Sequence, residues 1–216
     1  MPPVLVRPSR PADREAVRGI ACDTADRGEP VEHFFHDREV FADLVTHYYT
    51  AYEPQSMWVA ECDGRVIGYL AGCLESRRYE RVMRWRIIPR ATLKAMGRGA
   101  LWHPSTWRLL WAGMWTWWRG GLRRAVALER YPAHLHVNLR QDFWGQHIGD
   151  RLVERFLARL RAARVSGLYA PVRSDNAPSC RFFERLGFVA LIRHRVVFPD
   201  RGAYVLRETV IYGKTL

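Results

Sequence analysis

Residues 133–162 constrain the fold of this chain most, because they predict a strand, a short loop and a long helix in direct succession. In Ala133–Leu139, polar and apolar residues alternate, which is the period of a β-strand with two different faces. The polar face carries His134, His136 and Asn138. After the loop, apolar residues recur at the spacing of an amphipathic helix, namely Ile148, Leu152, Phe156, Leu157 and Leu160. A helix N-terminus offers unpaired N–H groups and partial positive charge, so this junction suits a phosphate or pyrophosphate group.

The loop itself resembles motif A of the GNAT superfamily of acyl-CoA-dependent N-acyltransferases. In the family pattern, Arg or Gln is followed by two residues, Gly, one residue, and Gly or Ala, where a helix begins. Aligned on the last glycine, the loop reads Trp144, Gly145, Gln146, His147, Ile148 and Gly149. Trp144 takes the place of Arg or Gln, and His147 takes the place of the first glycine. The imidazole of His147 therefore either crowds the ligand or adds a donor to it.

A second stretch, residues 174–188, resembles the other GNAT signature, in which Asn precedes a short helix with an aromatic pair and then Glu-Arg-Leu-Gly-Phe. Here the asparagine is Asn176 and the aromatic pair is Phe182-Phe183. A predicted strand, Leu168–Arg173, separates the two motifs in the order that the family has. The resemblance implies an α/β (α+β) fold with a mixed, mostly antiparallel central sheet flanked by helices.

The remaining parts of residues 1–75 and 130–216 predict further strands and helices that fit this fold. Asp63-Gly64 is a strong hairpin signal between two of the strands. One helix begins near Pro11, and another spans Asp37–Tyr52 with a stripe that includes Val45. The strands are expected at Val4–Arg7, Trp58–Cys62, Val66–Cys73, Leu191–Val197 and Ala203–Tyr212, the last two being joined by residues 199–202.

An insert at about residues 76–130, between the third and fourth predicted strands, is not covered by the resemblance. It holds thirteen of the Lys and Arg residues against only Glu80 and Glu129, so it carries nearly all of the formal net charge of +12. A basic helix is expected over Arg77–Ile88, stopped by Pro89, and a second is expected to begin at a Ser105 cap and to end at Gly120-Gly121. The second helix has one continuous apolar stripe, formed by Trp107, Leu110, Trp111, Met114, Trp115 and Trp118.

Three interpretations of the insert are open. The stripe packs on the core or on a second copy of the chain, as in a homodimer. Alternatively, Trp and Arg on an amphipathic helix form a peripheral contact with a membrane surface. Basic and aromatic residues also suit single-stranded nucleic acid, but a continuous stripe is not a spaced stacking ladder, and this disfavours nucleic acid.

We expect one GNAT-like domain over residues 1–216. No signal peptide and no apolar run approaching the roughly 20 residues of a membrane span is visible. The four cysteines, which lie far apart, fit small buried residues in a reducing compartment and show no metal spacing. The chain is therefore expected to be cytoplasmic, with peripheral membrane contact if the insert docks there, and to need no metal.

The resemblance implies acetyl-CoA as co-substrate. Backbone groups of the central strand would hold the pantetheine arm, the loop before the helix would hold the pyrophosphate, and the second motif would contact the far side of the arm. The implied cofactor-binding residues are Val137, Asn138, Leu139, Trp144, Gly145, Gln146, His147, Ile148, Gly149, Asn176, Ser179 and Phe183.

Acyl transfer to an amine also needs a base, for which a pKa near 7 serves best. His136 is the candidate, through a water molecule and with Asn138 or His134 beside it, although polar residues that merely line a strand end would look the same. Many GNAT enzymes place a Tyr hydroxyl, which protonates the leaving thiolate, at the position that Phe183 occupies here. Ser179, Tyr169 or water is the candidate replacement.

In GNAT proteins, the first helix, the loop after it and the second helix border the acceptor site. The candidate acceptor contacts are Asp23, Asp26, Glu29, His33 and His36, each of which is equally well explained as part of a solvated loop. The implied function is an N-acetyltransferase that acts on the amine of an unidentified acceptor. The alternative is a catalytically weak or inactive acyl-CoA-binding module that the insert docks to a membrane surface or protein partner.

Overall fold

The structure of this protein is a computed structural model that describes residues 3–120, 126–200 and 202–216. Within these residues one sheet has the strand order β1-β2-β3-β4-β5-β7-β6, and all neighbours are antiparallel except β4 and β5. The predicted mixed, mostly antiparallel sheet is thus confirmed. The strands are β1 Leu5–Pro8, β2 Met57–Cys62, β3 Arg65–Cys73, β4 Ala133–Leu139, β5 Gly167–Arg173, β6 Val189–Asp200 and β7 Ala203–Thr215.

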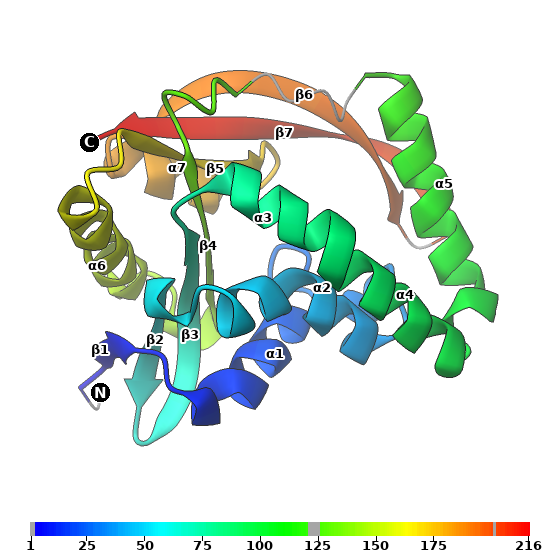
Figure 1. The fold of residues 1–216 in the computed structure, drawn as a ribbon, viewed down its shortest axis with the longest axis horizontal. Coiled ribbons are helices and arrows are strands. Elements are labelled where there is room, and N and C mark those ends of the chain that lie inside the picture. The colour runs from blue at the N-terminus through cyan, green and yellow to red at the C-terminus, as the bar shows by residue number, and fades with distance from the viewer. Residues whose placement is uncertain (1–2, 121–125, 201) are drawn as a thin grey trace.

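Helices cover both faces of the sheet, and three of them form the insert between β3 and β4 (Figure 1). The α-helices are α1 Arg14–Asp23, α2 Arg38–Ala51, α3 Ser76–Val82, α4 Ile88–Gly97, α5 Pro104–Trp118, α6 Ile148–Ala162 and α7 Ala177–Arg185. A π-helical turn, η4 Met83–Ile87, joins α3 to α4. Short 3₁₀ turns are η1 Pro11–Asp13, η2 Val31–His33, η3 Pro54–Ser56, η5 Ala100–Trp102 and η6 Gln141–Phe143.

The alternation of the strands separates two apolar layers. On one face, the α6 stripe predicted from the sequence is buried, and Phe156 packs against Trp58. On the other face, Tyr48 and Tyr49 of α2 pack with α1 and the opposite side of β3. Val45, predicted to share this stripe, is exposed instead, because the buried face of α2 runs through Ala42, Thr46 and Tyr49.

The predicted turns and strand ends are mostly confirmed. Asp63 and Gly64 both have positive φ values, of 49° and 73°, as a two-residue hairpin turn requires. β6 and β7 extend further than predicted, since Pro199 pairs with Tyr204 and Asp200 pairs with Ala203. Arg201 itself lies outside the described residues. All four cysteines are free thiols, and three of them are buried as expected.

The basic helix of the insert does not stop at Pro89, contrary to the prediction. A helical rod continues from α3 through η4 into α4, and Pro89 lies in the first turn of α4. Proline lacks an N–H and crowds the carbonyl of the fourth preceding residue. In the wider π turn, Ile88 donates its N–H to the Met83 carbonyl, five residues back, so the rod absorbs the proline instead of ending.

The second helix of the insert, α5, differs from the prediction in its cap and in the face that it buries. His103, and not Ser105, is the N-cap residue, and its Nδ1 accepts from the Ser105 N–H at 3.2 Å. The buried residues of α5 are Thr106, Ala112 and Thr116, whereas most of the predicted apolar stripe faces solvent. The predicted end at Gly120-Gly121 can be placed only as far as Gly120, because Gly121 lies outside the described residues. None of the described helices combines the length and apolar character that crossing a membrane requires.

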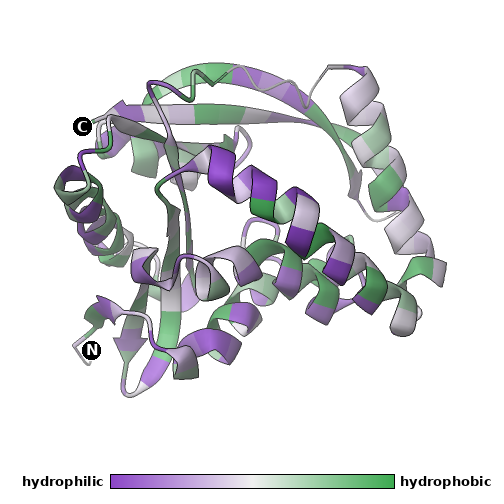
Figure 2. Ribbon diagram, viewed as in Figure 1, coloured by the Kyte–Doolittle hydropathy of each residue, from purple (hydrophilic) through white to green (hydrophobic). Residues whose placement is uncertain are grey.

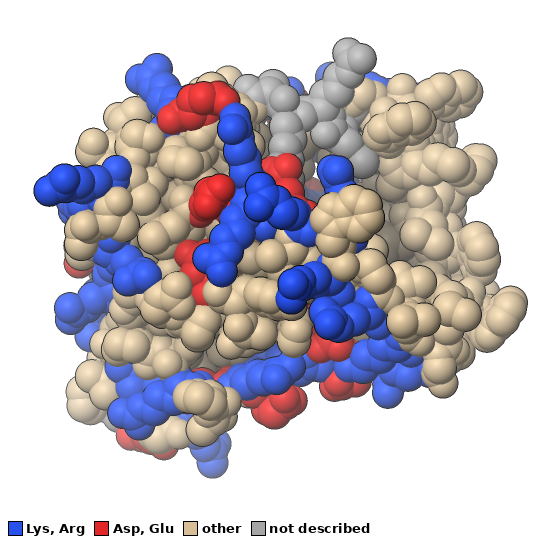
Figure 3. Space-filling view, in the orientation of Figure 1, with Lys and Arg blue, Asp and Glu red and all other residues tan. Residues whose placement is uncertain are grey.

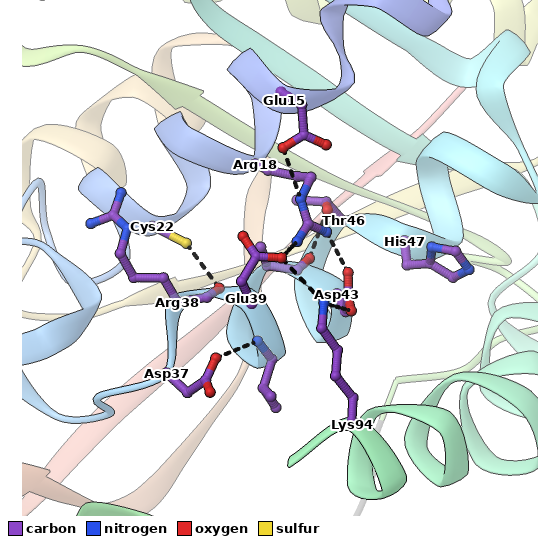
Figure 4. A network of polar contacts seen from close by, with 12 residues as sticks. Glu15, Arg18, Cys22, Asp37, Arg38, Glu39, Asp43, Thr46, His47 and Lys94 are labelled. Carbon is purple, nitrogen blue, oxygen red and sulfur yellow. Dashed lines mark hydrogen bonds and ion pairs between the residues drawn. The ribbon is translucent and has the colours of Figure 1, made fainter. Parts of the chain in front are cut away.

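Ion pairs fasten α4 to α1 and α2 (Figure 4). The Nζ of Lys94 lies 2.7 Å from Oδ2 of Asp43 and 3.2 Å from Oε2 of Glu39. Arg18 of α1 pairs with the same two carboxylates. Burial by itself raises the pKa of the Asp43 carboxyl, but hydrogen bonds from Lys94 and Arg18 outweigh this and hold the pKa below its usual value.

We expect a Lys94→Met variant to lower the free energy of unfolding by roughly 1 kcal/mol at neutral pH, a partly exposed pair being worth little more. A carboxyl with a lowered pKa in the folded state contributes stability above its usual pKa of 3.8, and this contribution is lost as the pH falls. The difference between wild type and variant should therefore shrink toward zero on acidification below that value. Urea unfolding at several pH values measures it, with Arg161→Met, at an exposed position of α6, as the matched control. A difference that is independent of pH would contradict the assignment.

Candidate active site

The parallel strands at the centre of the sheet separate and leave a cavity between them. β4 and β5 pair only at Ala133–Leu168 and His134–Tyr169. Beyond these pairs both strands line a cavity of about 880 Å³, which the loop before α6, the start of α7 and the loop after α1 complete. The lining segments are Thr24–Gly28, Leu135–Leu139, Phe143–Asp150 and Pro171–Arg173, together with residues of α7.

All of the predicted cofactor-binding and catalytic residues lie at this one cavity. From β4 and the loop these are His136, Val137, Asn138, Leu139, Trp144, Gly145, Gln146, His147, Ile148 and Gly149. From the second motif they are Asn176, Ser179 and Phe183. The structure thus brings together two motifs that are separate in the sequence, while the role of each residue stays a prediction.

Two residues of the loop before α6 adopt the left-handed backbone conformation. Gly145 and His147 have φ values of 78° and 58°, so both are left-handed. Histidine occupies this region more readily than most residues other than glycine. Its side chain is 71% exposed, with Nδ1 2.5 Å from Oδ2 of Asp150 and 3.1 Å from Nη1 of Arg185. The imidazole therefore lies at the rim of the cavity and does not fill it.

Trp144 and Gln141 fasten this loop to its neighbours. The indole N–H of Trp144 donates to the Leu139 carbonyl at 2.9 Å, so this carbonyl, which was expected to face the pantetheine arm, already has a donor. Nε2 of Gln141 donates to the Gly28 carbonyl at 3.0 Å. Both contacts hold the loop over the cavity, against the end of β4 and the loop after α1.

Gly149 allows α6 and α7 to approach each other. A Cβ atom at this position would lie 3.0 Å from the ring of Phe182, which is tighter than ordinary van der Waals contact. The first N–H groups of α6, which have no partner within the helix, adjoin the cavity at this point. The last glycine of the motif therefore has a steric reason in this fold.

His136 is open to the cavity, yet protein atoms surround it. This desolvation lowers the pKa of its imidazole to about 4. Its ring centroid lies 5.9 Å from that of Tyr49 and 5.8 Å from that of His134. At neutral pH the ring is unprotonated and has a free lone pair, but it is a weaker base than a group with a pKa near 7.

The neighbours of His136 are held by buried side chains that the sequence did not single out. Tyr69 of β3 accepts a hydrogen bond from Nδ2 of Asn138 at 2.9 Å, which orients the amide. His134 is buried, and its two ring nitrogens lie 2.9 Å from the Tyr49 hydroxyl and 2.8 Å from the Ser76 hydroxyl. These contacts assign His134 to the support of β4. The period of β3 and α2 could have indicated which tyrosines face β4, but not which would meet a polar partner.

In the second motif, Asn176 caps α7 and its Oδ1 accepts from the Ser179 N–H at 3.2 Å. Phe183 is buried against Phe188 and stacks near Tyr212. Ser179 lines the cavity, whereas Tyr169 packs beside His134 and is absent from the described cavity lining. Of the two side chains considered as proton donors, Ser179 is therefore the better placed.

The candidate acceptor contacts mostly take part in ion pairs. Asp26 is buried and pairs with Arg173 and with Arg207, the latter at 2.9 Å. His33 lies 2.9 Å from Asp200, and the ring of His36 stacks on that of His103. Asp23 pairs with Arg38 at 2.5 Å, while Glu29 forms a backbone bridge with Asp26. Only Asp26 of these five is among the described cavity-lining residues, and its carboxylate is already paired.

Basic side chains at the cavity are a feature that the sequence analysis did not use. Arg27 comes from the loop after α1, and Arg181 and Arg185 come from α7. The last two are four residues apart and so share a helix face, a signal that the sequence could have provided.

No group of three or more His, Cys, Asp or Glu side chains in the described residues is arranged to hold a metal ion.

Comparison with known proteins agrees with the fold and the motifs. The model of the Acetyltransferase (GNAT) family matches residues 111–188, from α5 to the end of the second motif. A crystal structure of SsHAT is 27% identical with a TM-score of 0.70, over 99% of this chain and 98% of that chain. The putative acetyltransferase yncA from Salmonella typhimurium, solved with its cofactor acetyl-CoA, is 18% identical with a TM-score of 0.61, over 99% and 94%.

A ribosomal-protein-alanine N-acetyltransferase from Brucella melitensis is 17% identical with a TM-score of 0.59, over 98% of this chain and 99% of that chain. At such identities the last two structures speak to the fold, while the family model covers both motifs that meet at the cavity. By its two motifs, their meeting between the separated strands and the shared fold, the chain resembles the GNAT superfamily of acyl-CoA-dependent N-acyltransferases, whose family model matches residues 111–188.

Proposed function

We propose that this protein transfers an acetyl group from acetyl-CoA to the amine of an acceptor, and that the reaction takes place between β4 and β5. The observation that carries the proposal is the cavity itself, which residues of both GNAT motifs line. Its volume of about 880 Å³ is within the usual range for a small-molecule site. The likeness to yncA, which was solved with acetyl-CoA, supports the choice of donor.

In the proposed complex, the pyrophosphate lies on the backbone N–H groups of Gly145–Gly149, where the α6 dipole adds favourable potential. The pantetheine arm lies along Val137–Leu139, in the gap where β4 lacks β5 as a partner. Asn176 and Ser179 face the arm from the other side. Arg181 brings positive charge to the same cavity, which suits the phosphates of CoA, while Arg27 and Arg185 beside it pair with Asp175 and Asp150.

The chemistry is direct attack of a neutral amine on the thioester carbonyl. The C–N bond forms, the C–S bond breaks, the amine loses one proton and the CoA thiolate gains one. In the proposal, His136, which is neutral at physiological pH, accepts this proton through water. Because Phe183 has no hydroxyl, the Ser179 hydroxyl or water protonates the thiolate. The acceptor amine would approach from Thr24–Gly28, a part of the lining that neither motif supplies.

Two measurements on the wild-type protein test the proposal. Calorimetric titration with acetyl-CoA should show micromolar binding, and release of free CoA thiol should increase when a panel of small amines and peptides is added. Binding without turnover on any amine would favour the alternative, an acyl-CoA-binding module. Absence of binding would overturn both, and would mean that Trp144 and His147 have removed the affinity of the loop for pyrophosphate.

A further inference from the structure

The outward face of α5 is apolar along its whole length. Six side chains that fall within one arc of this helix each expose more than half of their surface, namely Trp107, Leu110, Trp111, Met114, Trp117 and Trp118, and we call them the α5 apolar face. At roughly 150–250 Å² for a large aromatic side chain, they expose on the order of 600 Å² together, the upper end for the largest patch on a monomer. Figure 3 shows the corresponding right-hand margin of the molecule as nearly continuous tan.

The opposite face of α5 explains why the apolar face is left outside. Thr116 and Ala112 are small, so the helix lies close against β6, the edge strand of the sheet. The Thr116 hydroxyl accepts from the Val197 N–H at 2.8 Å and thereby satisfies a free group of that edge. In Figure 2, α5 is mainly green and pale, whereas α3 is mainly purple. The helix is therefore fixed by its small polar face and presents its large side chains to solvent.

The surroundings of the α5 apolar face are strongly basic. Residues 76–120 contain ten Lys and Arg residues and a single acidic residue, Glu80. Among the described residues, ion pairs engage three of the ten, which are Arg77, Lys94 and Arg98. Arg86 and Arg90 on the rod are exposed, and Figure 3 shows blue side chains beside the tan margin, over α4. Exposed apolar residues continue the surface on η5 and α4, where Trp102 is 82% exposed.

We propose that the α5 apolar face inserts into the interfacial region of an anionic lipid bilayer, with the arginines of the rod contacting lipid headgroups. Tryptophan is suited to this region because its large apolar ring carries a polar N–H. Each basic residue near an anionic surface adds attraction, and this chain has cations beside the face with few acidic residues to oppose them. An apolar helix face bordered by Arg is the arrangement of an interfacial helix that lies on a membrane without crossing it.

The charge distribution argues for lipid and against a second copy of the chain. In a two-fold dimer, the same patch meets itself, so the cations around the face would approach cations of the partner copy. An anionic bilayer has the complementary charge, and it is fluid enough to receive side chains of unequal length. The docking would leave the cavity free, because no residue of the α5 apolar face is among its described lining.

Flotation with vesicles tests the proposal. We expect the wild type to bind phosphatidylcholine vesicles that contain about 30% phosphatidylglycerol at least about tenfold better than pure phosphatidylcholine, and to bind less as salt rises. A Trp111→Ser, Met114→Ser variant should lose binding about tenfold or more, because it removes two inserting side chains. The matched control is Leu5→Ser, Val189→Ser, which changes two apolar side chains of similar exposure elsewhere and should bind like wild type.

A second pair of variants, which remove arginine charges, completes the design. Its outcome does not depend on whether the apolar variant folds. Arg86→Gln, Arg90→Gln should weaken binding to the anionic vesicles several-fold, whereas Arg65→Gln, Arg161→Gln should not. Absent vesicle binding, or equal losses in test and control variants, would overturn the proposal. So would a lipid-free dimer by light scattering that Trp111→Ser, Met114→Ser dissociates, since the face would then join two copies. Displacement from vesicles by single-stranded oligonucleotides at equal charge would point to nucleic acid instead.

Discussion

A Gly149→Glu variant is expected to lose acetyl-CoA binding roughly 100-fold or more, the equivalent of two or more charge-assisted hydrogen bonds. A side chain at this position meets the Phe182 ring from its first carbon onward. The added carboxylate would also lie at the N-terminus of α6, where the pyrophosphate is proposed to bind, and would repel it. Calorimetric titration of wild type and variant measures the loss.

The fold should survive this substitution, because an acidic residue in the first turn of a helix is favourable to the helix dipole. The matched control is Gly19→Glu in α1, where a Cβ meets no atom within 4 Å and which is not among the described residues lining the cavity. It should bind acetyl-CoA like wild type. Equal affinity of the Gly149→Glu variant and the wild type would show that the pyrophosphate lies elsewhere.

The second large effect is expected at His136. A His136→Gln variant should keep acetyl-CoA affinity within a few-fold but lose roughly 100-fold in kcat/KM, the usual contribution of a positioned base. With a pKa of about 4, the imidazole is neutral throughout the range from pH 5 to 8. Its own ionisation should therefore place no break in the wild-type pH profile near 6.5, and the rate should rise with pH as the acceptor amine loses its proton.

The matched control is His194→Gln on β6, a histidine whose pKa is likewise lowered by burial but which is not among the described residues lining the cavity. It should leave kcat/KM unchanged. A break in the wild-type pH profile of kcat/KM near pH 6.5 that disappears in His136→Gln would show that the imidazole titrates in its ordinary range. An unchanged kcat/KM in that variant would show that His136 has no role as the base and serves only as a residue of β4.

Much of the site was predictable because its parts are local. Strand alternation, the stripe of α6 and the short helix after Asn176 depend on residues a few positions apart, and all appear where the sequence placed them. The two motifs then meet because each follows a neighbouring strand of one sheet. What the sequence did not provide were partners far along the chain, such as Tyr69 for Asn138 and Arg207 for Asp26.

The strength of His136 as a base was also beyond the sequence. An imidazole on a strand has its ordinary pKa until neighbouring elements remove water from it. Tyr49 of α2 and His134 pack at about 6 Å from its ring, and the protein around it lowers the pKa to about 4. The lowered basicity of this histidine is thus a property of the assembled cavity.

The sequence by itself determined the strand and helix periods, the turn at Asp63-Gly64, the two GNAT motifs and the concentration of Trp and Arg in residues 76–130. The tertiary structure decided which face of α5 is buried. A helical period shows that Trp107, Trp111 and Trp118 share a face, but it does not show which face meets the protein. Thr116 and Ala112 allow a closer approach to β6, and the Thr116 hydroxyl accepts from the Val197 N–H of its edge, so the small face packs and the large one remains outside. The choice depends on how well a helix fits a strand that comes 81 residues later, and no local pattern carries that information.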